Sequence, residues 1–322
     1  MNDLTFKNAR STVNSICFDV LIALTPIVLW AVFLYGFRVL TLILCGVVSA
    51  VLIRLLSSLI LKKKEFTLFP VLSAAIVTLC LPASAPLYLP IIACAVGEMI
   101  SVIFSFFGRC YLSPSAVSVL ICHLAFPKIM DGIPQIFTRL HPFKITLGSF
   151  EKAPASSLQQ VLDGPLPEND VTKVFFGFES SMMGQVSAFL ILAGGVYLMF
   201  RRIIKPLPTV IFASGIGLGT YFMPTLYAAS DLVAFKGAMY NVLGMGTLFC
   251  IIYLASDPRS RAKTTAGAII SALIGAAVTF AVRYYLYPQI SVLCGVLAFN
   301  IASAICDKFL IPMQFGGRIK NK

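Results

Sequence analysis

Long stretches of apolar residues alternate with short polar breaks along almost the whole chain, and this pattern predicts membrane-spanning helices. A helix needs about 20 mostly apolar residues to cross the hydrocarbon core of a bilayer. Because the stretches are continuous rather than alternating, they favour helices over the strands of a membrane barrel. Several are short, and the fifth is short enough for a broken or re-entrant helix. The ten predicted spans are 17–35, 39–61, 66–81, 87–107, 112–126, 182–200, 207–222, 238–255, 262–281 and 287–306.

The bulk composition agrees with a bilayer environment. Of the 322 residues, 58% are hydrophobic and only 12% are charged, with a mean hydropathy of +0.92. A soluble domain carries about twice this charged fraction, so the chain has too little polar surface to coat a water-soluble globule. The predicted fold class is therefore an all-α polytopic integral membrane protein, because in a bilayer only helices or closed barrels satisfy the backbone polar groups.

Lysine and arginine residues occur in short clusters between the apolar stretches, within a net charge of +12. This distribution indicates topology control and contact with anionic lipids rather than nucleic-acid binding. If the N-terminus lies inside, basic clusters such as 62–64 and 201–205 fall on the inner side at every turn, and the short outer loops hold only Arg38, Lys236 and Arg283. Ten spans then place both termini in the cytoplasm, in a multi-pass protein of the inner (cytoplasmic) membrane.

One segment differs from the rest, because residues 127–181 are mixed in composition and rich in Pro, Gly, Ser and charge. The segment joins the fifth and sixth predicted spans, so the same topology places it outside. Long loops of this kind are usually functional or disordered. The loop divides the chain into two transmembrane halves of five helices each, residues 1–126 and 182–322, and this division suggests a duplicated architecture.

Nine cysteines invite a metal or disulfide interpretation, but none forms a C-x-x-C pair and almost all lie in apolar stretches. Buried thiols acting as small apolar residues are the simpler interpretation, while an iron–sulfur cluster shared with another subunit stays open. The sequence has no Walker loop, no G-x-G-x-x-G after a strand, no nucleophile elbow and no H-E-x-x-H. Having only two histidines disfavours haem ligation by paired histidines.

Three motifs resemble landmarks of one family of membrane proteins and occur in that family's order. The stretch Phe175 to Ser187, followed by Arg201-Arg-Ile-Ile204, resembles F-L-G-x-x-x-G-S-I-G-E-x-S and R-R-I-I. Leu254-Ala-Ser-Asp-Pro258 resembles M-A-T-D-P, and residues 107–114 resemble G-x-N-x-F-N-P. This family contains RnfD and NqrB, the flavin-bearing membrane subunits of the Rnf and sodium-pumping quinone reductase complexes, and the chain length is closer to that of RnfD.

The resemblance implies FMN bound through a phosphoester to a hydroxyl side chain in the central outer loop. The family motif D-x-x-[ST]-G-A-[ST], followed by P-L, corresponds here to residues 150–158, and its threonine falls on Ser156. Ser156 is therefore the predicted attachment residue and Ser157 the alternative. Glu151 stands one place from the family's Asp, and Pro154 replaces a small residue. A plain loop serine without flavin is the other interpretation.

The resemblance also assigns a second group of residues, and a second, noncovalent flavin is compatible with it. Asp257 is a candidate site residue or the cap of the next segment, and Gly184 allows either flavin approach or close helix packing. Ser187 closes the first motif and is a candidate flavin contact. His123 in the fifth span is either a flavin contact or a hydrogen-bonded packing residue.

Two ionisable residues inside the spans need a partner or a function, because a charge at the bilayer centre costs roughly 2.5–3.5 kcal/mol or more. Glu98 lies midway along the fourth span and Arg54 lies within the second. Both are candidates for an ion path, in which Glu98 binds a cation or relays protons. The alternative is a structural ion pair between them.

Together these features predict a membrane subunit of an Rnf-type ion-translocating electron-transport complex, which is a redox subunit of a multi-subunit oxidoreductase or translocase. It would relay electrons through FMN, coupled to Na⁺ or H⁺ movement. Its implied partners are the other Rnf-type membrane and peripheral subunits and a flavin transferase. Two alternatives stay open: a transporter or channel of the same architecture without flavin, and a structural subunit that carries no cofactor.

Overall fold

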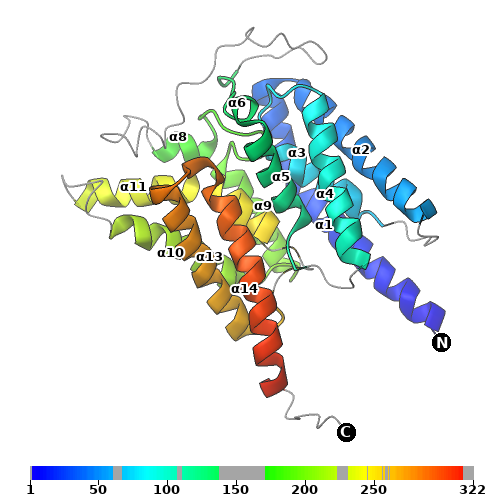
Figure 1. Cartoon of the computed structure of the whole chain (residues 1–322). Coiled ribbons are helices and arrows are strands. Elements are labelled where there is room, and N and C mark those ends of the chain that lie inside the picture. The colour runs from blue at the N-terminus through cyan, green and yellow to red at the C-terminus, as the bar shows by residue number, and fades with distance from the viewer. Residues whose placement is uncertain are drawn as a thin grey trace.

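The computed structural model shows a bundle of packed helices (Figure 1). It describes residues 2–60, 67–106, 111–137, 171–222, 231–244, 246–255, 257, 260 and 262–314. The first helix begins, and the last helix ends, on the lower side of the bundle in Figure 1, whereas the short helices α6 and α8 lie on the upper side. The two ends of the chain therefore lie on the side opposite to the segments that flank the central loop.

Every predicted span contains a helix. The N-terminal part of the chain forms α1 (Asn2–Tyr35), α2 (Arg38–Ile60), α3 (Phe69–Leu79), α4 (Tyr88–Phe106), α5 (Pro114–Ala125) and the short α6 (Pro127–Met130). The C-terminal part forms α8 (Val171–Phe176), α9 (Ala188–Phe200), α10 (Pro206–Tyr221), α11 (Asp231–Leu243), α12 (Thr247–Phe249), the π-helix η1 (Cys250–Ala255), α13 (Thr265–Tyr285), the 3₁₀ turn η2 (Pro288–Ile290) and α14 (Ser291–Gln314).

The lengths of the helices support some of the predicted spans. Within the described residues, five are long and apolar enough: Val13–Tyr35, Arg38–Ile60, Tyr88–Ser105, Thr265–Tyr285 and Pro288–Phe309. A sixth span exists if α11 and the following α12–η1 together form one broken span. The axes of these two pieces are bent by 52° relative to each other. Helices α3, α5 and α9 have only 11, 12 and 13 residues, or about 17–20 Å against a hydrocarbon core of about 30 Å. The all-α membrane class is confirmed; the ten full spans and the inside–outside orientation stay predictions.

The same set of helix neighbours recurs in two groups. Helix α2 packs against α3 and α4, and α4 packs against α5. In the second group α10 packs against α11 and α13, and α13 packs against α14. Helices α1 and α9 pack against each other. This recurrence favours the duplicated architecture inferred from the sequence.

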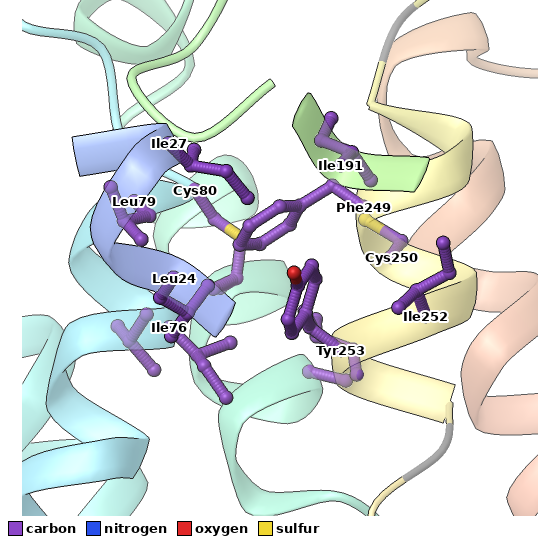
Figure 2. Close-up of a cluster of buried hydrophobic side chains, with 14 of the residues drawn as sticks. Leu24, Ile27, Ile76, Leu79, Cys80, Ile191, Phe249, Cys250, Ile252 and Tyr253 are labelled. Atoms are coloured by element: carbon purple, nitrogen blue, oxygen red, sulfur yellow. The ribbon is translucent and has the colours of Figure 1, made fainter. Parts of the chain in front are cut away.

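An apolar core joins the two groups. In Figure 2 side chains from α1, α3, α9, α12 and η1 point towards one another around the ring of Phe249. The short helix α3 is buried along almost its whole length, which explains why so apolar a segment need not face lipid. The labelled members of this core are Leu24, Ile27, Ile76, Leu79, Cys80, Ile191, Phe249, Cys250, Ile252 and Tyr253.

Two arginines that the sequence places in short outer loops are buried instead, each with only 1% of its surface exposed. Arg38 opens α2, and its Nε and Nη2 donate to the carbonyls of Ala83 (3.0 Å) and Ala85 (2.6 Å). These carbonyls belong to the segment that separates α3 from α4. The assignment of Arg38 to a loop was wrong because the carbonyls of Ala83 and Ala85 lie outside any helix and need a donor in an apolar medium.

Arg283 has the same role in the second group. It lies in the last turn of α13, and its Nη1 donates to the backbone and side-chain oxygens of Asn241 (2.9 and 3.1 Å). Its Nη2 and Nε donate to the hydroxyls of Thr247 (3.0 Å) and Ser291 (3.1 Å). Asn241 and Thr247 flank the break between α11 and α12, so the guanidinium holds the two helix pieces at their bend.

We predict that Arg283→Ala strongly destabilises the protein. The change leaves several buried acceptors without their donor, and each such group costs about 1–3 kcal/mol. The thermal unfolding midpoint in detergent should fall well below that of the parent protein, and added guanidinium at low concentration should restore part of the loss. Lys236→Ala, an exposed cation on α11, is the control. Equal midpoints for the two variants would contradict the role given to Arg283.

Candidate functional site

Helices α1, α3 and α5, the end of α9 and the π-helix η1 surround a pocket between the two helix groups. The gap between its walls measures about 480 Å³ with open solvent included, and about 40 Å³ of it can hold the centre of a water molecule. A mostly apolar wall with a few polar groups is typical of pockets that bind cofactors, and π-helical turns are frequent at functional sites. The lining residues are Val20, Phe69, Leu72, Ser73, Ile76, Ser113, Ser115, Leu198, Ile203, Ile204, Ile252, Tyr253 and Asp257.

Three of the sequence landmarks meet at this pocket although they are far apart along the chain. Ser113 comes from residues 107–114, Ile203 and Ile204 come from the R-R-I-I stretch, and Asp257 comes from the stretch that ends in Asp-Pro. The local folds explain the convergence. Pro114 starts α5 directly after Ser113, as proline favours the first turn. Arg202 adopts a left-handed backbone (φ 58°), which turns the chain back so that the backbone N–H of Ile203 donates to Leu198 O (3.0 Å).

The polar side chains that line the pocket are three serines, one tyrosine and one aspartate. The hydroxyls of Ser73 and Ser115 lie 3.0 Å apart and share a hydrogen bond between α3 and α5. The hydroxyl of Tyr253 donates to the carbonyl of Ala23 (3.5 Å) on α1. Asp257 is buried, with 9% of its surface exposed. Sequence reasoning found Asp257 but missed the serines and Tyr253, because each belongs to a different apolar stretch and no motif connects them.

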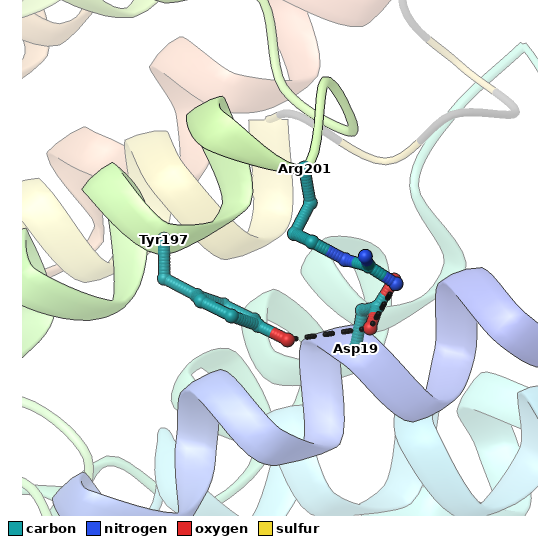
Figure 3. A network of polar contacts seen from close by, with 3 residues as sticks. All are labelled: Asp19, Tyr197 and Arg201. Atoms are coloured by element: carbon teal, nitrogen blue, oxygen red, sulfur yellow. Dashed lines mark hydrogen bonds and ion pairs between the residues drawn. The ribbon is translucent and has the colours of Figure 1, made fainter.

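An ion pair fixes α1 to the end of α9 close to this pocket. The guanidinium of Arg201 donates to both carboxylate oxygens of Asp19 at 3.0–3.1 Å (Figure 3). The hydroxyl of Tyr197 donates to Asp19 Oδ1 at 3.3 Å. Paired contacts of this kind fix geometry as well as charge. The first arginine of R-R-I-I thus positions the turn that carries Ile203 and Ile204. The signal in the sequence was Asp19, an acidic residue at the start of an apolar stretch.

The connecting segment 177–187 lies towards the other end of α1 and is bound to it. The indole N–H of Trp30 donates to Gly177 O (3.5 Å), and the hydroxyl of Tyr35 donates to Ser181 O (3.0 Å). At the end of α3, the N–H of Gly184 donates to Leu79 O (2.7 Å). The motif from Phe175 to Ser187 therefore joins α1, α3 and α9.

These contacts favour structural roles for two predicted site residues. A Cβ atom on Gly184 would lie 2.7 Å from Leu79 Cβ and 3.1 Å from the ring of Phe249, so the glycine permits close packing. Ser187 caps α9, because its hydroxyl accepts from the N–H of Leu190 (3.4 Å) and donates to Phe175 O (3.3 Å). Neither residue lines the pocket.

Of the remaining predicted site residues, Arg54, Glu98 and His123 are described by the structure and do not line the pocket. Arg54 Nε lies 2.8 Å from Glu98 Oε1, and Glu98 is buried, so the structure brings these two together as an ion pair. The Nδ1 of His123 lies 3.0 Å from Val119 O in the last turn of α5, which favours the packing interpretation. The predicted attachment residues Ser156 and Ser157, and Glu151 beside them, lie outside the described residues.

The part of the chain that the structure describes holds eight of the nine cysteines, five of them buried. Cys80 and Cys250 are in hydrogen-bonding contact within the apolar core. No three His, Cys, Asp or Glu side chains within that part are grouped as metal ligands.

A half-buried carboxyl, that of Glu179, lies in the connecting segment beside α11. The hydroxyl of Tyr240 donates to Glu179 Oε1. Burial raises the pKa of Glu179 above its ordinary value, and the hydrogen bond from Tyr240 and the charge of Lys173 oppose the rise. The net result is a carboxyl that holds its proton to higher pH than an exposed glutamate does.

The fold and the pocket define a multi-pass membrane protein with a buried site between two helix groups. Residues 1–316 match the family model described as NQR2, RnfD, RnfE, so the chain belongs to this family.

Relatives within the family are named as components of larger complexes. The chain is 23% identical over 325 residues to the D subunit of the proton-translocating ferredoxin:NAD(+) oxidoreductase complex of Clostridium ljungdahlii, covering 95% of this chain and 93% of that protein. It is 25% identical over 273 residues to the D subunit of the Na(+)-translocating ferredoxin:NAD(+) oxidoreductase complex of Acetobacterium woodii, covering 76% and 82%. It is 26% identical over 255 residues to the B subunit of the Na(+)-translocating NADH-quinone reductase of Pseudomonas aeruginosa, covering 77% and 60%.

We predict that Glu179→Gln changes how stability depends on pH. Because the folded pKa of Glu179 lies above the unfolded value, the folded state binds more protons, and the parent protein loses stability as pH rises from about 4.5 through the folded pKa. The substituted amide keeps an acceptor for Tyr240 and removes the titration, so the variant should gain stability relative to the parent over this range. Thermal unfolding from about pH 4 to 8 measures this, with the exposed Asp131→Asn as control. Parallel pH profiles for parent and Glu179→Gln would refute the assignment.

Proposed function

We propose that this chain is a membrane subunit of an Rnf-type ion-translocating electron-transport complex and that it relays electrons through flavin. One observation carries the proposal. Three sequence motifs that resemble the family and lie far apart along the chain each contribute residues to one pocket between the two helix groups. Packing of a helical bundle alone does not require these landmarks to share a cavity. The names of the relatives support membership of such a complex.

The lining chemistry of the pocket supports a noncovalent flavin ring as the proposed ligand. A flavin supplies electron-transfer chemistry when bound, and the protein positions and tunes it. The side chains of Leu72, Ile204 and Ile252 provide flat apolar walls that exclude water. The hydroxyls of Ser73 and Ser115 are donors and acceptors for the polar edge of a ring, and the carboxylate of Asp257 is an acceptor for a ring N–H.

A covalently bound FMN on Ser156 completes the proposed relay. The hydroxyl satisfies the chemical requirement of a phosphoester, and Ser157 is the alternative one residue further on. The loop that carries Ser156 leaves and re-enters the bundle on the side opposite to the two ends of the chain. A flavin transferase acting outside the cytoplasm is the partner that this attachment needs, provided that both termini lie inside.

Electron flow would be coupled to Na⁺ or H⁺ movement together with other subunits of the complex. The named relatives include both proton- and sodium-translocating complexes. Glu98 and Arg54 stay the candidates for an ion path, with their ion pair as the resting arrangement. Anionic lipids are the proposed neighbours of the basic clusters. One of those cations, Lys205, lies at a second pocket, which is otherwise lined by apolar side chains and Thr209.

A transporter or channel without flavin is the second candidate. The bent helix pair α11 and α12–η1 and the recurring helix neighbours favour it, because broken helices in repeated halves are common in secondary transporters. Such a protein would purify colourless and would move solute in vesicles without partners. A structural subunit without cofactor would also be colourless but would not transport.

We predict that Ser156 carries FMN when the chain is matured with a flavin transferase. The denatured protein should give a flavin-fluorescent band on a gel, and the peptide containing Ser156 should carry the added mass of FMN. Ser156→Ala should abolish the band, whereas Ser157→Ala should retain it. Absence of fluorescence and of added mass in the native sequence would reject covalent attachment.

We predict that filling the pocket removes the noncovalent flavin but leaves the covalent one. Ser115→Phe places a ring in the cavity and breaks the hydrogen bond to Ser73, so flavin released by acid precipitation should fall severalfold. Ser115→Val is a milder version, and Ser214→Phe on the exposed face of α10 is the matched control. Equal release from Ser115→Phe, Ser214→Phe and the parent would exclude the pocket as the flavin site.

A further inference from the structure

The second pocket, which we call the α10 pocket, lies between α10, the π-helix η1, α13 and α14. The gap between its walls measures about 360 Å³ with open solvent included, and about 20 Å³ of it can hold the centre of a water molecule. A space this narrow admits a chain of methylene groups more readily than a ring system. Its lining residues are Lys205, Pro208, Thr209, Phe212, Ile251, Ala255, Ala262, Ala268 and Phe299.

The interior of the α10 pocket is apolar. The rings of Phe212 and Phe299 are buried and stack with their centroids 5.9 Å apart, and Ile251 beside them is buried as well. The hydroxyl of Thr209 donates to the carbonyl of Lys205 (3.2 Å), so its hydrogen is already engaged. A buried water molecule needs about two to four polar partners, and the other lining side chains apart from that of Lys205 have none to offer. Hydrocarbon therefore suits this interior better than water does.

A cation lies at the rim of the α10 pocket. Lys205 comes directly before α10 and is partly exposed. Its Nζ donates to the carbonyl of Lys263 (3.2 Å), which uses one of the three donors of an ammonium group. The carboxylate of Asp307 accepts the backbone N–H of Lys263 (2.9 Å), and neither ion pair among the described residues involves Lys205. The lysine therefore keeps donors and a positive charge for an anionic group.

The surroundings of the rim are those of a membrane–water boundary. Arg201 and Arg202, at the end of α9, are exposed cations. Leu207 and Val210, in the first turns of α10, are exposed apolar side chains. Cations directly beside an apolar helix surface are typical of the level of the lipid headgroups. Lys205 thus lies where lipid phosphates are found, beside a pocket that is open to an acyl chain.

We propose that the α10 pocket binds one anionic phospholipid, with its phosphate at Lys205 and part of one acyl chain in the apolar interior. The inference rests on the proposed contact between anionic lipids and the basic clusters, and it adds a defined site for one such lipid. Basic pockets between membrane helices are known to bind anionic headgroups. A free phosphate would leave the apolar interior empty, and an uncharged hydrocarbon would leave Lys205 without a counterion.

A lipid in this site would brace the π-helix. Ile251 and Ala255 of η1 line the α10 pocket, whereas Ile252 and Tyr253 line the pocket proposed for the noncovalent flavin. The π-helix is therefore the common wall of two pockets and has incomplete packing on both sides. An acyl chain against Ile251 fills one of these gaps, so lipid binding should raise the thermal unfolding midpoint of the protein in detergent.

A photoreactive lipid tests the site directly in the full-length protein. The probe is phosphatidylglycerol that carries a diazirine near the end of one acyl chain, added to the protein in detergent micelles. After illumination, peptides containing Phe212 or Phe299 should carry the added mass of the lipid. Phosphatidylcholine with the same labelled chain should label these peptides severalfold less. Excess unlabelled phosphatidylglycerol should compete with the label, and excess inorganic phosphate should not.

Two substitutions and a matched control assign the headgroup contact. Lys205→Ala should lower the labelling severalfold, whereas Lys205→Arg keeps the charge and should retain it. Lys308→Ala removes an exposed cation of α14 that does not line the pocket, and it should label like the parent. Added phosphatidylglycerol should raise the thermal midpoint of the parent and of Lys308→Ala by more than that of Lys205→Ala. Midpoints measured without lipid show whether each variant is folded, and the comparison of the two lipids on the parent needs no variant.

Three results would overturn the proposed site. Equal labelling by the two lipids, or unchanged labelling in a folded Lys205→Ala, would reduce the contact to general lipid around the helices. Displacement of the label by inorganic phosphate would indicate an anion site without an acyl chain. None of these measurements requires flavin. Failure of the lipid site therefore leaves the proposed electron relay standing, and a protein that carries no flavin leaves the lipid site standing.

Discussion

The structure depends on one constraint: inside a bilayer every backbone polar group must find its partner within the protein. Long helices satisfy this by themselves, but this chain interrupts its helices at the end of α3 and between α11 and α12. At each interruption a buried arginine supplies donors, Arg38 in one group and Arg283 in the other. The two positive charges are thus part of the backbone hydrogen bonding of the fold.

Interrupted helices also create the space in which chemistry becomes possible. Helices α3, α5 and α9 have only 11 to 13 residues, and the segments at their ends turn within the helix bundle. These turns bring Ser113, Ile203 and Ile204 together, and Asp257 joins them from beyond the π-helix. A bundle of full-length helices would pack its side chains continuously and would leave these residues at separate surfaces.

The sequence by itself determined the membrane class, the position of the ten apolar segments that contain helices and the family, because hydropathy and local motifs depend on neighbouring residues. The number of full spans stays a prediction, since apolar content does not distinguish a lipid-facing helix from a short buried one such as α3. The sequence also placed Arg38 and Arg283 in loops, because charge alone suggests solvent. Only the tertiary structure decided the pocket and the ion pair between Asp19 and Arg201, since each joins residues more than a hundred positions apart whose contacts leave no local pattern.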